Sequence, residues 1–270
     1  MLNLLQMELM RLRKNRSTYW IAIVFLLIIV LSMVLNHFTL TAMESFYTPP
    51  TSEYNVPSFM LEDFQGEKML VRIFSNKSFL LFLNIFAALF FTQPYRHGFI
   101  KNFLPYSNHR KKYALAQFLS ALLYAVILGI LGLAIQTLSY AFVYNGIFTL
   151  TNPSLLVVPL LLQILAHGSF LALLQVVATW TSSMAATLVF GLFYGQILGV
   201  LIYDFLTYLV SQFIDLHENF NFMQFTSLGA ITNTTIGSTQ DQLILAGIVA
   251  TILLLIYLFI STLIMQKKDY

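Results

Sequence analysis

The sequence predicts an all-α integral membrane protein with six transmembrane helices, and three observations lead to this fold class. Hydrophobic residues make up 58% of the 270 residues and charged residues only 9%, whereas soluble globular proteins carry about 25% charged residues. Apolar runs recur at roughly the 20 residues that a helix needs to cross the hydrocarbon core. The runs lack the period-two alternation of barrel strands, and lipid offers no partner to a free backbone amide, so they must be helical.

The first predicted element is a short amphipathic helix over residues 1–18. Four leucines recur there at three- and four-residue steps: Leu2, Leu5, Leu9 and Leu12. Such an apolar stripe predicts a helix that lies in the membrane interface. A basic topology signal that happens to contain leucines is the alternative. The apolar run that follows is too long for the core of a cleaved signal peptide, so we expect it to be retained as the first span.

The six spans are predicted in order along the chain. They cover residues 19–38, 78–95, 113–140, 155–180, 184–210 and 243–265. The second span is short, because its unbroken apolar core reaches only from residue 79 to residue 91. The connection 39–77 contains three prolines and mixed charge, which indicates an extracellular loop without a core of its own. The connection 211–242 is more apolar than an aqueous loop, and we expect part of it to re-enter the outer membrane face as short helices.

The distribution of charge predicts that both termini are cytoplasmic. Of the 14 basic residues, four precede the first span, five lie in the connection 96–112 and two follow the last span. Lys and Arg collect in cytoplasmic connections, so these three stretches are predicted inside. Eight of the 11 acidic residues fall in the opposite connections. Topology and anionic membrane lipids therefore account for the net charge of +3, which does not indicate a nucleic-acid partner.

The connection 96–112 contains a predicted short helix after Gly98. Its apolar side would be formed by Phe99, Ile100, Phe103 and Leu104, and its polar side by Lys101 and Asn102. Basic residues then crowd the first turns of the third span, where the helix dipole disfavours cations. Topology and anionic lipid headgroups account for those cations. The amphipathic helix before them suits contact with lipid or with a cytoplasmic partner.

This segment resembles the permease subunit of ABC-2-type transporters. The resemblance rests on a glycine, an Ile-Lys-Asn run, a short helix, an arginine and a tyrosine before the third span, here Gly98, Ile100, Lys101, Asn102, Leu104, Arg110 and Tyr113. The six-span order, the short turn 181–183 and the semi-apolar segment before the last span extend it over the whole chain. The resemblance implies a multi-pass subunit of a cell membrane, foremost the bacterial plasma membrane, that pairs with a second permease subunit, identical or different.

The resemblance also implies a function. The chain would couple ATP hydrolysis by two copies of a separate ATPase subunit to export of an amphipathic or apolar substrate, foremost antimicrobial or cytolytic peptides, with drugs, lipids or glycans as alternatives. In the family, the connection between spans two and three contacts the ATPase, which implies that role for residues 98–104 and Arg110. No GxxxxGK[ST] phosphate loop occurs in the sequence, so ATP and Mg are expected on the partner and no cofactor on this chain.

Several residues inside the spans are candidates for a substrate pathway or for helix packing. The candidates for the pathway are Phe79, Phe82, Phe86 and Phe90, which form one stripe, and the ionisable residues His167 and Asp204. The alternative for the phenylalanine stripe is ordinary packing, and the alternative for His167 is a neutral packing residue. The alternative for Asp204 is a position at the outer membrane interface. The glycines Gly191, Gly195 and Gly199 recur every four residues and allow close helix contact, either within the chain or between subunits.

The sequence contains no pattern that indicates catalysis or a metal site. We find no paired carboxylates, no metal-spaced histidines, no nucleophile motif and no cysteine. A second class of function stays open at this point, namely a non-transporting membrane sensor or an intramembrane enzyme whose basic connection binds anionic lipid.

Overall fold

The computed structural model describes residues 2–46, 66–75, 77–96, 107–143, 150, 152–213 and 220–268, and every regular element in these ranges is a helix. The α-helices are α1 (Leu2–Lys14), α2 (Arg16–Phe46), α4 (Gly66–Ser75), α5 (Lys77–Arg96), α7 (Ser107–Val143), α8 (Val157–Thr181), α9 (Met184–Leu192), α10 (Gly199–Ser211), α11 (Ser227–Thr232) and α12 (Gln240–Lys267). Two short 3₁₀ helices, η1 (Pro153–Leu156) and η3 (Phe222–Phe225), and one π-helical turn, η2 (Phe193–Leu198), connect them.

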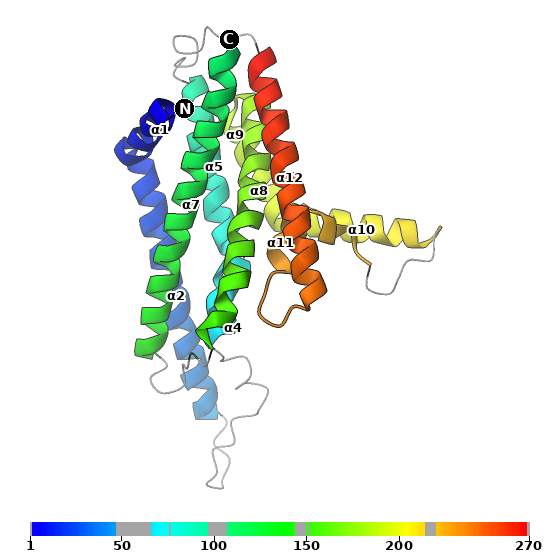
Figure 1. Ribbon diagram of the computed structural model, residues 1–270. Coiled ribbons are helices and arrows are strands. Elements are labelled where there is room, and N and C mark those ends of the chain that lie inside the picture. The colour runs from blue at the N-terminus through cyan, green and yellow to red at the C-terminus, as the bar shows by residue number, and fades with distance from the viewer. Residues whose placement is uncertain are drawn as a thin grey trace.

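The long helices form a bundle that carries both termini at one end (Figure 1). We call this the terminal end and the opposite one the distal end. Five described stretches are long and apolar enough to cross a membrane: Arg16–Leu35, Gly66–Tyr95, Arg110–Phe142, Pro153–Thr181 and Gln240–Lys267. A bent pair, Met184–Gln196 with Gly199–Ser211, makes a sixth if it counts as one span. The structure thus confirms the all-helical architecture, and it has five helices long and apolar enough to cross a membrane, or six if the bent pair is one span, where the sequence predicts six.

The second apolar stretch begins earlier than predicted. Residues 66–77 belong to the connection 39–77, which was predicted as an extracellular loop because it contains three prolines and mixed charge. In the structure these residues form α4, which buries Leu70, Val71 and Phe74 and leaves Arg72 exposed. A helix can bury one face and keep charges on the other, so an interrupted run can still belong to the bundle. Likewise, α2 continues to Phe46, past the predicted end at residue 38.

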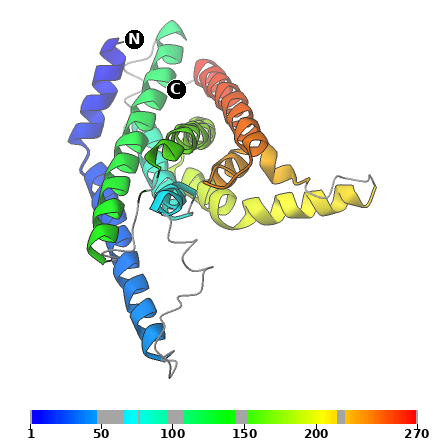
Figure 2. The same ribbon diagram turned by 60° about the horizontal axis from the view of Figure 1, so that its bottom comes forward.

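The fifth apolar stretch, predicted as one span over residues 184–210, is bent. The π-helical turn η2 separates α9 from α10, and the axes of the two parts differ by 55°. A Cβ atom at Gly199 would collide with the carbonyl group of Tyr194, so the bend depends on a residue without a side chain. Beyond it, α10 leaves the bundle sideways as an arm (Figures 1 and 2).

Part of the connection 211–242 folds back into the bundle as short helices. All but the last residue of α11 are buried, and the helix packs against α8 and α12. The side-chain amide of Gln163 on α8 donates hydrogen bonds to the carbonyl oxygens of Ile231 and Thr234, both at 2.8 Å. These bonds satisfy backbone groups at the end of α11, where no further helical turn is available.

Candidate functional site

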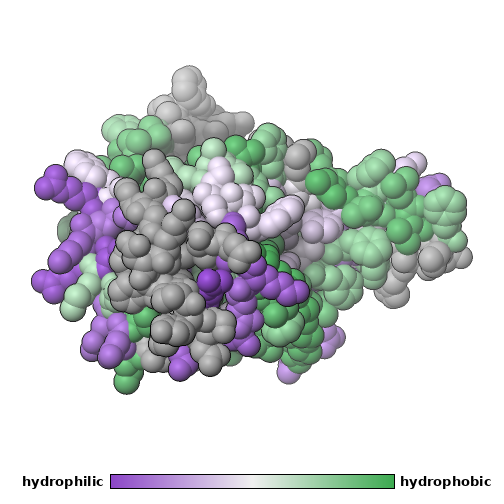
Figure 3. All heavy atoms as spheres, turned by 90° about the horizontal axis from the view of Figure 1, so that it is seen from above, coloured by the Kyte–Doolittle hydropathy of each residue, from purple (hydrophilic) through white to green (hydrophobic). Residues whose placement is uncertain are grey.

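The described residues of the three basic stretches lie at the terminal end of the bundle (Figure 1). Arg11 of α1 contacts Tyr113 of α7, and Arg110 of α7 contacts the last carbonyl groups of α12. Hydrophilic residues gather on this end (Figure 3). α5 ends and α7 begins at the same end, where Tyr95 near the end of α5 packs against the cluster of Tyr113, Ala114 and Met265. Residues 98–104 themselves lie outside the described residues.

Arg110 binds the end of α12. Its Nη1 atom donates to the carbonyl oxygens of Gln266 at 3.1 Å and Lys268 at 3.0 Å. The last carbonyl groups of a helix have no partner within the helix and carry partial negative charge, so a cation is favourable there. The dipole of α7 disfavours a cation at the start of that helix, and the contact with the end of α12 compensates Arg110 for this.

Lys268 repeats this arrangement at the end of α8. Its Nζ atom donates to the carbonyl oxygens of Thr179 at 2.7 Å and Trp180 at 2.9 Å, and to the hydroxyl of Ser182 at 2.5 Å. Ser182 ends α8 in the left-handed conformation, with φ of 52°. Burial lowers the pKa of the Lys268 ammonium below its usual range. Arg110 and Lys268 therefore link the ends of α12 and α8 to the start of α7, and we call these two residues the clasp.

A buried ion pair joins α1 to the same end of the bundle. The Arg11 guanidinium lies 2.8 Å from Oε2 of Glu8, and it donates to the hydroxyl of Tyr113 at 3.0 Å and to the carbonyl oxygen of Phe90 at 3.0 Å. Its central carbon also lies 4.2 Å from the centre of the Phe90 ring. Glu8 is fully buried, which raises the pKa of its carboxyl above 4.5, while Arg11 opposes that rise. α1 is therefore anchored to α5 and α7 by polar contacts.

This ion pair was not predicted from the sequence, where the apolar stripe of α1 was the feature interpreted. In the structure Leu12 is buried, whereas Leu2 is 75% exposed. The available signal was the spacing of Glu8 and Arg11, which places opposite charges on neighbouring positions of one helix face. Their partners Phe90 and Tyr113 are far away in sequence, so the spacing alone could not show burial.

The phenylalanine stripe of α5 lies in the core of the chain. Phe79, Phe82, Phe86 and Phe90 are each at most 6% exposed. Phe79 and Phe82 contact Phe25 of α2, with ring centres 5.4 and 5.3 Å apart. Phe86 stacks on Tyr124 of α7 at 4.0 Å. These contacts hold α2, α5 and α7 together, which is the packing alternative that the sequence left open.

His167 and Asp204 have separate surroundings. His167 is buried on α8, with Nδ1 at 2.8 Å from the carbonyl oxygen of Gln163, so Nδ1 carries the proton. Its ring packs at 4.9 Å against Phe79, beside a cavity of about 120 Å³ that Gln163 also lines. Asp204 is exposed on α10, and its Oδ1 accepts a hydrogen bond of 2.8 Å from Asn221. The structure therefore gives these two ionisable residues different partners.

The glycine pattern of α9 and its extension supports packing within the chain. A Cβ atom at Gly191 would collide with the side chain of Asn84 on α5, and one at Gly195 would come within 2.9 Å of Leu80. Because Gly191 leaves room, the Asn84 amide reaches the carbonyl oxygen of Leu188 at 3.0 Å. Gly199 serves the bend described above. Each of the three glycines thus has a close neighbour in its own chain.

No protein-family model, curated protein or solved structure matches this chain. Within the residues that the structure describes, no group of three or more His, Asp or Glu side chains could hold a metal ion. The terminal end, with the clasp and the Glu8–Arg11 pair, is therefore the candidate functional site that the geometry defines.

Proposed function

We propose that the chain is the membrane-spanning permease subunit of an ATP-binding cassette exporter. It would couple ATP hydrolysis by a separate ATPase subunit to the export of an amphipathic or apolar substrate, foremost antimicrobial or cytolytic peptides and then drugs, lipids or glycans. It would act in a cell membrane as one of two permease subunits with two ATPase subunits. The proposal starts from the resemblance of residues 98–113 to ABC-2-type permeases.

The observation that carries the proposal is the position of the clasp. The predicted coupling segment joins α7 a few residues before Arg110, Arg110 binds the end of α12, and Lys268 binds the end of α8. A displacement of the segment by a partner would therefore be passed to three helices at once. Hydrogen bonds with a charged donor are shorter and roughly twice as strong as neutral ones, which suits them to this transmission.

The mechanism follows from the rule that a ligand shifts a conformational equilibrium only through contacts that differ between two states. Closure of two ATPase subunits on ATP would move the coupling segment, and the clasp would move α8 and α12 together with α7. The π-helical turn between α9 and α10 supplies a break at which the angle between these helices can change.

Co-purification tests the pairing with an ATPase. The tagged chain is extracted in mild detergent from cells that naturally produce it, and bound proteins are identified by mass spectrometry. We expect an ATPase with a phosphate-loop motif. Ile100→Ser combined with Phe103→Ser should release it by removing the apolar side of the segment. Phe142→Ser is the control, because Phe142 is exposed near the distal end of α7 and should leave the complex intact.

Lys268→Met tests the coupling of ATP hydrolysis to the permease separately from binding of the ATPase. Lys267→Met is its matched control, because Lys267 is exposed beside Lys268. We expect Lys268→Met to keep the ATPase bound but to lose most of the difference in ATPase rate between the assembled complex and the isolated ATPase. The proposal fails if the chain never carries an ATPase, or if the Ile100→Ser, Phe103→Ser variant retains it fully.

A further inference from the structure

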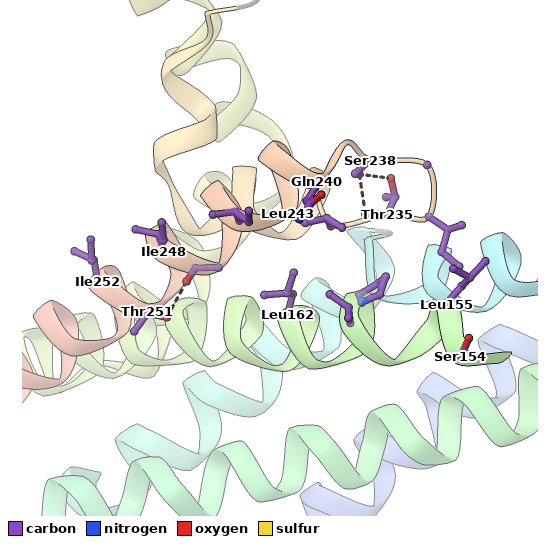
Figure 4. Close-up of a pocket in the computed structure, with 16 residues that line it drawn as sticks. Ser154, Leu155, Leu162, Thr235, Ser238, Gln240, Leu243, Ile248, Thr251 and Ile252 are labelled. Atoms are coloured by element: carbon purple, nitrogen blue, oxygen red, sulfur yellow. Dashed lines mark hydrogen bonds between the residues drawn. The ribbon is translucent and has the colours of Figure 1, made fainter. Parts of the chain in front are cut away.

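A groove of about 920 Å³ lies between α8 and α12 in the distal part of the bundle (Figure 4). Pro159 and Leu162 of α8 face Leu243 and Gly247 of α12 across it. The two helices approach closely at its base, where a Cβ atom on Gly247 would lie 3.0 Å from Cδ2 of Leu162. The volume is within the range of roughly 300 to 1,000 Å³ that is typical of small-molecule sites.

The groove is polar at its distal mouth and apolar along its length. Ser154, Thr235, Ser238 and Gln240 surround the mouth. The hydroxyl oxygens of Thr235 and Ser238 lie 3.0 Å apart, which fixes this rim. Further along, α12 contributes mainly isoleucines, and the hydroxyl of Thr251 donates to the carbonyl oxygen of Gly247 at 2.7 Å. Because this hydroxyl is bonded to the backbone of its own helix, the wall of the groove is largely apolar.

The dimensions of the groove match one leaflet of a bilayer. At a rise of 1.5 Å per residue, the α12 residues from Gln240 to Ile252 extend over about 18 Å. The hydrocarbon core is roughly 30 Å thick, so the groove covers slightly more than half of it. The side chains at its edges are half-exposed, with 54% for Leu155, 53% for Ile244 and 52% for Ile248. The groove is therefore open sideways, along the direction from which a lipid chain would enter.

The charge around the groove restricts the headgroup. None of the residues that line it is charged. In the segments 150–181 and 226–266, which contain these helices, Asp241 is the only Asp, Glu, Lys or Arg. On the adjoining α4, the Glu67 carboxylate accepts a hydrogen bond of 2.6 Å from the amide of Asn152, two residues before Ser154. A carboxylate beside the mouth repels an anionic headgroup, whereas the hydroxyl and amide groups of the rim accept a headgroup that forms hydrogen bonds.

We propose that this groove binds one acyl chain of a lipid from the distal leaflet, with a headgroup that carries no net charge and lies against the polar rim. The site is distinct from the clasp, on the opposite half of the bundle. Lipid binding in this groove does not depend on pairing with an ATPase, so the lipid site and the proposed function can be tested separately.

Retention of lipid by purified protein tests the site. Ile248→Trp fills the groove, and Leu255→Trp is the matched control because Leu255 is exposed on the same face of α12, two turns further along and beyond the groove. After purification of the full chain in detergent, tightly bound lipid is counted by native mass spectrometry. We expect the wild-type chain and Leu255→Trp to keep one lipid that Ile248→Trp loses. Equal retention by both variants would overturn the proposal.

The choice of headgroup is tested on the lipid that the unlabelled chain retains. The wild-type chain is reconstituted in vesicles that contain equal amounts of phosphatidylethanolamine and phosphatidylglycerol and purified again in detergent, and the retained lipid is identified by native mass spectrometry. We expect about a fivefold preference for phosphatidylethanolamine, the factor associated with one charge near an anionic lipid surface. A preference for phosphatidylglycerol contradicts the proposal. So does an oxidised, disulfide-linked dimer of Ile248→Cys, in a chain that has no natural cysteine, because it would identify the occupant as a second chain.

Discussion

The environment of Arg11 shows how a residue can decide the position of a whole helix. Arg11 has polar or ring contacts with Glu8, Tyr113 and Phe90, and Glu8 has no exposed surface. A buried charge pair adds little stability relative to apolar residues, but removal of one partner leaves an uncompensated charge. The pair therefore fixes where α1 docks more than how tightly it binds.

Replacement of Arg11 by Ala should lower the free energy of unfolding by about 3 to 5 kcal/mol, because Glu8 would remain buried without its partner. Arg13→Ala, on the exposed side of α1, is the control and should have little effect. Glu8→Leu combined with Arg11→Met should recover most of the loss. Thermal unfolding in detergent measures all four proteins, and a double variant as unstable as Arg11→Ala would show that the pair is not the cause.

Gly191 of α9 matters for the way that whole helices meet. Gly191 lets the Asn84 side chain lie against the backbone of α9 and donate to Leu188. Small residues allow the backbones of membrane helices to approach closely, and polar side chains then bond across the contact. One glycine thus sets the distance between α5 and α9.

Gly191→Ala should separate α5 from α9 and lower the free energy of unfolding by about 1 to 3 kcal/mol, as overpacking of a filled interior does. Asn84→Ala in the same chain should restore part of this loss, because it removes the side chain that the new methyl group meets. The measurement is thermal unfolding of the single and double variants. No recovery in the double variant would indicate that Asn84 is not the obstacle.

In the whole molecule, α1, the start of α7 and the end of α12 meet at the terminal end. This end therefore carries most of the basic residues. Lys and Arg are retained on the cytoplasmic side of a membrane, so we expect the terminal end inside and the groove in the outer leaflet. The absence of cysteine makes the orientation directly measurable.

Lys112→Cys and Gln240→Cys, both at exposed positions, should react oppositely with a membrane-impermeant maleimide. In intact cells that express the chain we expect labelling at position 240 only, and at position 112 only after the membrane is made permeable. Labelling of position 112 in intact cells would reverse the orientation. Reaction at both positions after permeabilisation is the control for accessibility.

The helices could be predicted from sequence because each apolar run carries its own signal, whereas contacts between runs carry none. The approximate limits of α8 and α12 followed from hydropathy alone. The bend before Gly199 did not, because it depends on the Tyr194 carbonyl lying against a glycine. The clasp was equally hidden, since Arg110 binds carbonyl groups more than 150 residues further along the chain, and carbonyl groups have no sequence signature.

The contact between Gln163 and the end of α11 also sets an order of events during synthesis. Gln163 lies on α8, which leaves the ribosome long before residues 231 and 234 exist. Until those residues arrive, its amide can bond only water or a side chain made earlier, such as the Ser75 hydroxyl at 3.1 Å in the finished chain. The contacts of Gln163 are therefore complete only after residue 234 has been made, and a nascent chain stopped before α11 should differ from the finished protein at this helix.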